Sequence, residues 1–128
     1  MSSFISRKQY YCLLLLCLLK LAIAYHYKVH VYIANDVGKD VDLTVHCKSK
    51  DDDLGVHLLH DQETYQFSFH RNVWGTTLFY CKFTWSDQLK WFDIFVEDKY
   101  FCQDCYWKIK ADGPCLQDIP ITCFEWNK

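Results

Sequence analysis

The clearest strand signal in this chain of 128 residues is VDLTVHC at residues 41–47. Its members Val41, Leu43, Val45 and Cys47 alternate with polar residues, as expected for a β-strand with one buried face. The alternation therefore predicts a strand here and places the Cys47 side chain on its buried side.

Similar alternation recurs on both sides of this stretch, and residues 25–128 show no helical periodicity of useful length. Breaks rich in polar residues or glycine separate the runs, and the break at 72–75 suits a hairpin loop. We predict one all-β domain, an antiparallel β-sandwich of seven to eight short strands. The further runs lie at 28–33, 56–58, 65–70, 78–85, 91–97, 106–110 and 119–124.

The first 24 residues have the pattern of a secretory signal peptide. Arg7 and Lys8 precede an apolar run at 12–23, and Ala22-Ile23-Ala24 has the small residues of a cleavage site. A membrane anchor is the alternative, but the run is shorter than the roughly 20 apolar residues of a span and is interrupted by Lys20. We predict cleavage after Ala24, residues 25–128 as the mature domain, a secreted protein and no membrane insertion after cleavage.

Six of the eight cysteines follow the predicted cleavage point. An even number in a short secreted chain predicts disulfides, although the spacing alone does not fix their pairing. The Cys-x-x-Cys at Cys102 and Cys105 has zinc and thiol-redox alternatives. A redox motif begins a helix, whereas 106–110 has strand alternation, and zinc would need a second pair at matching spacing. We therefore favour structural disulfides and expect no metal and no cofactor.

The acidic run Asp51-Asp52-Asp53 is followed by Leu54 and Gly55. A calcium loop alternates its ligands, whereas three adjacent aspartates cannot all point inward, so we interpret 49–55 as a solvated charged loop. The histidines show no catalytic spacing, and no nucleophile motif is present, so we expect no enzyme activity. A net charge of −2 gives no basic field for nucleic acid.

Aromatic residues make up 18% of the chain. Those of the outward phase or near the tail form either a binding face or a surface covered by the C-terminal tail. Trp74, in the 72–75 loop, is either a lid on the core or an interface anchor. The inward set is Phe67, Phe69, Phe79, Phe83, Trp85, Phe92 and Trp107, and the other set is Tyr32, Tyr80, Trp91, Phe95, Tyr106, Phe124 and Trp126.

Four blocks in order resemble the plant self-incompatibility S-protein homologues. They are HCKSKDDDLG at 46–55, FSF at 67–69 with WGTTLFYC at 74–81, WFDIF at 91–95, and CYWKIKADGPC at 105–115. The resemblance implies a small secreted β-sandwich with two disulfides, Cys47–Cys115 and Cys81–Cys105. This chain adds Cys102, Cys123 and a tail, for which we hypothesise a third bridge, Cys102–Cys123.

The resemblance also implies an extracellular signalling ligand for a plant cell-surface receptor, similar to the stigma determinants of self-incompatibility. Specificity is expected in loops on a rigid scaffold. We predict Asp51, Asp52, Asp53 and Trp74 as the partner-binding residues. The alternative function is a secreted defence protein or a protein that binds cell walls or glycans, suggested by the aromatic surplus.

Overall fold

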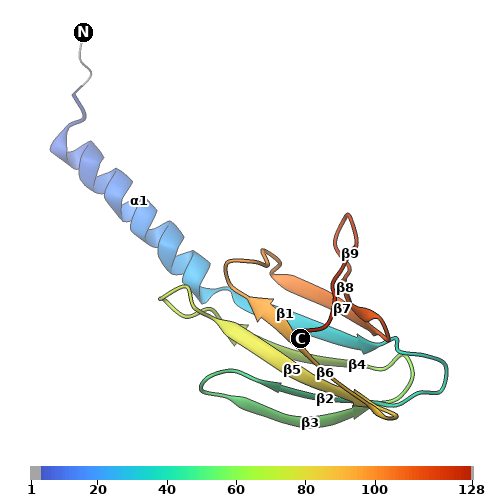
Figure 1. Ribbon diagram of the computed structural model, residues 1–128. Helices are drawn as coiled ribbons and strands as arrows, with labels where there is room; N and C mark the ends of the chain where they lie inside the picture. Colours follow the sequence, from blue (N-terminus) through green and yellow to red (C-terminus); the bar gives the residue numbers. More distant parts are fainter. Residues whose placement is uncertain (1–3, 128) are drawn as a thin grey trace.

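The computed structural model describes residues 4–127, without the side chains of 23–26. Helix α1 (Arg7–His26) projects away from two facing sheets (Figure 1). Ser6 caps this helix, since its side chain accepts a hydrogen bond from Gln9 N and Gln9 bonds back to Ser6 N. Within the described residues, no helix is long and apolar enough to cross a membrane. The predicted cleavage site at Ala24 falls inside α1, where the Ala24 side chain lies outside the described part.

The strands form two sheets, which confirms the β-sandwich. One sheet has the order β4-β1-β7-β8-β9 and the other β3-β2-β5-β6. Their bounds are β1 (Lys28–Asn35), β2 (Leu43–Lys48), β3 (Asp53–Leu59), β4 (Thr64–His70), β5 (Leu78–Trp85), β6 (Gln88–Val96), β7 (Asp104–Lys110), β8 (Gly113–Leu116) and β9 (Thr122–Cys123).

Two details of the predicted architecture are wrong. Strands β1 and β7 pair in parallel, because the chain returns from β6 and enters β7 beside the start of β1, with His30 opposite Asp104. The strand count among the described residues is also higher, nine instead of seven to eight, because β8 was missed. In addition, β3 begins at Asp53, earlier than the predicted run at 56–58. Strand β8 carries Pro114 next to its first residue, a sequence that indicates a turn more readily than a strand.

The core lies between the sheets and follows the predicted alternation. Strands β1, β2 and β5 bury every second residue. Phe67 and Phe69 of β4, predicted inward, are only half-buried and pack against the core. Phe95 differs in the opposite sense, because it was predicted on the outward phase and is fully buried. A bulge opposite Phe79 and Tyr80 shifts the register of β6, so that Ile94 and Phe95 both enter the core.

The C-terminal tail covers part of the core, and its residues Phe124 and Trp126, two of the aromatic residues predicted outside the core, pack against it. Phe124 packs 5.8 Å from both Phe92 and Trp107, and Trp126 packs 5.4 Å from Phe83, measured between ring centres. The tail is held to both sheets, since Phe124 N donates to Pro114 O and Asn127 N donates to Trp91 O. Trp91 and Tyr106 remain exposed.

All six cysteines of the domain form disulfides, but every predicted pairing is wrong. The observed pairs are Cys47–Cys81, Cys102–Cys105 and Cys115–Cys123. Cys47 faces Cys81 across β2 and β5, and Cys115 faces Cys123 across β8 and β9, each with Cα atoms 4.0 Å apart. The two pairs implied by the resemblance would have joined opposite sheets, whereas the observed bridges each join neighbours in one sheet or one turn.

Candidate functional site

The two loops singled out from the sequence lie side by side at one end of the sandwich. The β2–β3 loop, residues 49–52, follows Lys48, which is paired with Tyr80 near the start of β5. The β4–β5 loop, residues 71–77, enters β5 at the same place. It connects the two sheets and is therefore not the hairpin loop predicted for 72–75.

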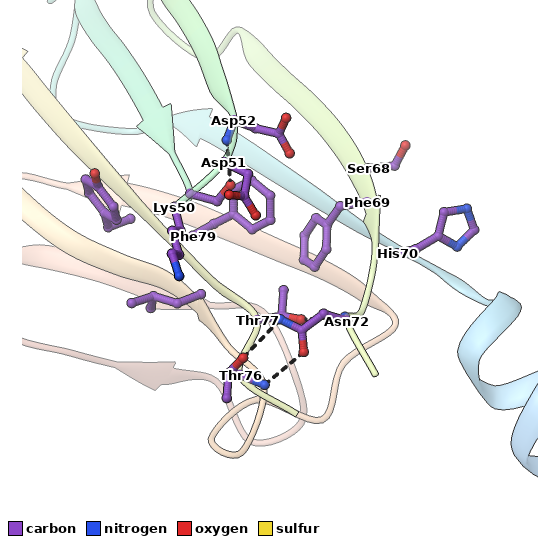
Figure 2. Close-up of a pocket in the computed structure, with 13 residues that line it drawn as sticks. Lys50, Asp51, Asp52, Ser68, Phe69, His70, Asn72, Thr76, Thr77 and Phe79 are labelled. Atoms are coloured by element: carbon purple, nitrogen blue, oxygen red, sulfur yellow. Dashed lines mark hydrogen bonds between the residues drawn. The ribbon is translucent and has the colours of Figure 1, made fainter. Parts of the chain in front are cut away.

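A groove of about 710 Å³ separates these two loops (Figure 2). Phe69 and Phe79 lie between the loops, with ring centres 4.4 Å apart. Asp51 and Asp52 stand on one side and polar residues of the β4–β5 loop on the other. The lining residues are Ser49, Lys50, Asp51, Asp52, Ser68, Phe69, His70, Asn72, Thr76, Thr77, Leu78, Phe79 and Tyr80.

Asn72 organises the β4–β5 loop. Its Oδ1 accepts hydrogen bonds from Trp74 N at 3.1 Å and Thr76 N at 3.0 Å, and its Nδ2 donates to Thr76 Oγ1 at 3.1 Å. Asn72 N donates to Thr77 Oγ1 at 2.8 Å, and Thr77 N donates to Glu97 Oε2 at 3.0 Å. The loop is therefore fixed by its own side chains and tied to the residue that follows β6.

Trp74 stands at the tip of this loop, with 83% of its surface exposed. This exposure excludes the lid on the core. Trp74 does not line the groove and lies beside it, next to Val73, which is also exposed. The indole therefore projects into solvent beside the groove.

The three adjacent aspartates have different surroundings. Asp53 begins β3, and its Oδ1 accepts from Gly55 N at 2.9 Å and lies 2.6 Å from His46 Nε2. The hydrogen bond from Gly55 N, followed by the one with His46, lowers the pKa of Asp53. Its carboxylate is thus engaged within the fold and outside the groove.

Asp51 and Asp52 face the groove with free carboxylates. Neither side chain forms an ion pair with another described residue. Their loop is closed by its backbone and Ser49, since Ser49 N donates to Asp52 O and Asp52 N donates to Ser49 Oγ. The structure therefore brings Asp51 and Asp52 to one site, with Trp74 nearby. Asp53 lies outside this site and stabilises the end of the β2–β3 loop.

Sequence reasoning missed several lining residues, among them Phe69, His70 and Thr76. The break at 72–75 was predicted as a loop, but Asn72 was not identified as the residue that holds it. The sequence does contain a signal for this role. Asparagine side chains often accept hydrogen bonds from backbone N–H groups a few residues further along a turn, and Asn72 lies two residues before Trp74 and four before Thr76. Among the described residues, no group of three or more histidine, cysteine, aspartate or glutamate side chains could hold a metal.

Comparison with known proteins identifies the family. The family model described as plant self-incompatibility protein S1 matches residues 30–126. This chain belongs to that family. The match covers β1 from His30 onward, strands β2 to β9, both groove loops and the tail through Trp126.

Curated members of the family from Arabidopsis thaliana are closely similar. S-protein homolog 5 is 49% identical over 87 residues, covering 66% of this chain and 68% of that protein. S-protein homolog 20 is 46% identical over 103 residues, covering 77% and 76%.

A solved structure of a self-incompatibility protein homologue (SPH) has the same fold. It aligns with a TM-score of 0.59 at 18% identity, over 79% of this chain and 96% of that one. The SPH proteins are described there as a widespread family of small, highly stable, secreted proteins from plants.

Proposed function

We propose that this protein is a secreted plant ligand that binds a cell-surface receptor through the groove between the β2–β3 and β4–β5 loops. The chain begins with a predicted signal peptide, and the solved SPH protein belongs to a family described as secreted. The proposed activity is recognition and involves no catalysis.

The observation that carries the proposal is that the two groove loops expose unpaired carboxylates and a tryptophan side chain. Free carboxylates at Asp51 and Asp52 face the groove, and the largely exposed Trp74 stands beside it on a loop held by Asn72. Interfaces gain much of their affinity from a few aromatic anchors, and exposed charges accelerate association with an oppositely charged partner. This arrangement fits a receptor surface with basic residues around a pocket for an indole.

Binding of the labelled, oxidised protein to living plant cells of several tissues tests the proposal. We expect saturable binding to particular cell types, competed by unlabelled protein and lost on reduction. Trp74→Ala should lower the affinity about tenfold or more, as truncation of an interface anchor does. Asp51→Asn with Asp52→Asn should slow association and flatten its dependence on salt.

A matched control removes two negative charges from the other end of the sandwich, with Asp87→Asn and Asp112→Asn. Both residues are exposed and form no ion pair with a described residue. This control should bind as the unmodified protein does. Unsaturable binding, or equal kinetics for the two charge variants, contradicts the proposal.

A further inference from the structure

Arg71, the first residue after β4, is a cation without a partner. It is half-buried, and its guanidinium forms no ion pair and no side-chain hydrogen bond with a described residue. Its Nε is buried and unpaired. The guanidinium carbon lies 6.0 Å from the centre of the Phe95 ring, an attraction that uses none of the N–H donors. The terminal nitrogens are not buried and also form no hydrogen bond with a described residue, so they are the donors that an incoming acceptor can reach.

Arg71 lines a pocket of about 220 Å³, separate from the groove and here named the Arg71 pocket. It is lined by Tyr27, Val29, Arg71, Phe101 and Gln103. Phe101 is 87% exposed and Tyr27 is 56% exposed, so two aromatic rings stand at its rim. The volume suits one sugar ring or one side chain, and no larger group.

Charged residues of both signs lie near the Arg71 pocket. Lys28 and His70 are opposite one another in the β1–β4 pairing, directly before Val29 and Arg71, and both are exposed. The nearby Glu97 already accepts a hydrogen bond from Thr77 N. Asp104, which follows the lining residue Gln103, is also exposed, so the attraction for a negatively charged group comes chiefly from the unpaired Arg71 guanidinium.

We propose that the Arg71 pocket binds a uronic-acid residue of an acidic polysaccharide. The guanidinium offers paired N–H donors to the carboxylate, a geometry that carboxylates accept in two parallel hydrogen bonds. The Phe101 ring offers an apolar face for the C–H groups of the sugar ring, and the Gln103 amide can bond its hydroxyls. A free phosphate or an acidic peptide would use Arg71 but would leave the exposed rings without a role.

Titration of the secreted, disulfide-bonded protein with two trisaccharides tests this proposal. One is a trimer of galacturonic acid and the other is the neutral trimer of galactose, followed by amide NMR shifts around residues 71 and 101. We expect saturable binding of the acidic trimer and affinity at least about tenfold lower for the neutral one. Arg71→Gln should lower the affinity for the acidic trimer about tenfold, and Phe101→Ala several-fold.

Lys39→Gln is the matched control, because it removes the same charge from an exposed loop at the opposite end. It should leave binding unchanged. Equal affinity of the two trimers overturns the proposal, as does equal loss in Arg71→Gln and Lys39→Gln. Equally tight binding of inorganic phosphate or triglutamate also overturns it, because neither contains a sugar.

Folding of the variants is checked by thermal melting. Phe101→Ala keeps the proposal testable if Arg71→Gln unfolds, because Phe101 is almost fully exposed. The inference goes beyond the proposed receptor role and rests on different residues. Asp51→Asn with Asp52→Asn should retain trimer binding, so failure of one proposal is distinguishable from failure of the other.

Discussion

The two ends of the sandwich are each organised by an asparagine, and the two asparagines lie in contrasting surroundings. At one end Asn35 is fully buried, and its Nδ2 donates to Val41 O at 2.7 Å and Leu59 O at 3.0 Å. At the groove end the half-buried Asn72 holds only its own loop, by bonds to Trp74 and Thr76. Asn35 therefore joins segments that are distant in sequence, whereas Asn72 orders only its own loop.

The charged side chains differ in the same way. At the Asn35 end, Asp36 accepts a hydrogen bond from Gln62 and pairs with Lys110, Asp42 bonds to His60, and Asp61 accepts from Asp40 N. At the groove end, Asp51, Asp52 and Arg71 have no such partners among the described residues. More charged side chains are therefore bonded within the fold at the Asn35 end, although Asp87, Asp112 and Lys39 there form no ion pair with a described residue.

The largest expected effect is loss of stability in Asn35→Ala. The variant leaves the carbonyl groups of Val41 and Leu59 without their donor and opens a cavity in the core. We expect the free energy of unfolding to fall by about 2–3 kcal/mol, measured by denaturant unfolding of the oxidised protein.

Gln66→Ala is the control for this change. Gln66 also carries an amide but is exposed on β4, so its variant should alter stability by no more than about 0.5 kcal/mol. A loss below about 1 kcal/mol in Asn35→Ala would mean that the Asn35 end is not closed by this side chain.

Much of the fold was predictable from local alternation, and what was missed depends on contacts between distant segments. The alternation at 41–47 predicts β2 because one face of this strand is buried. No local pattern tells which strand becomes its neighbour, and that choice decides that Cys47 meets Cys81. Likewise, the burial of Phe95 depends on a bulge against β5, which the sequence of β6 alone does not reveal.

The intermediate effect concerns the β4–β5 loop. Asn72→Ala removes the acceptor for the N–H groups of Trp74 and Thr76. We expect a loss of about 1 kcal/mol in stability, and lower amide order parameters for residues 73–76 by NMR relaxation. The proposed receptor binding should weaken, because the Trp74 anchor must then be ordered on binding.

Asn72→Asp sharpens this test, because aspartate keeps the acceptor oxygen and loses only the donation to Thr76 Oγ1. The loop should then retain most of its order. Unchanged relaxation in Asn72→Ala would show that the loop is held by Thr77 and Glu97 instead.

The candidate site was predictable only in part, for a similar reason. The acidic run and Trp74 are visible in the sequence, but their approach follows from the pairing of β2 with β5. Asp53 could not be separated from Asp51 and Asp52 by sequence, because its hydrogen bond with His46 crosses from β3 to β2. Arg71 carried no signal at all, since the absence of a partner is a property of its surroundings in three dimensions.

The smallest expected effect is the pH dependence of the Asn35 end. The hydrogen bond of His60 Nδ1 with Asp42, at 2.8 Å, raises the pKa of His60, and the charges of Asp42 and Glu63 add to this. A raised folded-state pKa stabilises the fold fully below the unfolded-state value of about 6.5, and the stabilisation is lost as pH rises through the folded-state value. His60→Gln should therefore flatten the decline in stability on the alkaline side of pH 6.5, in denaturant unfolding from pH 5.5 to 8.5.

His70→Gln is the control, because His70 is exposed and has no hydrogen-bond partner among the described residues. This variant should keep the decline in stability. If both variants follow the pH profile of the unmodified protein, the His60–Asp42 contact does not contribute to closing this end, and Asn35 holds it without help from the surface charges.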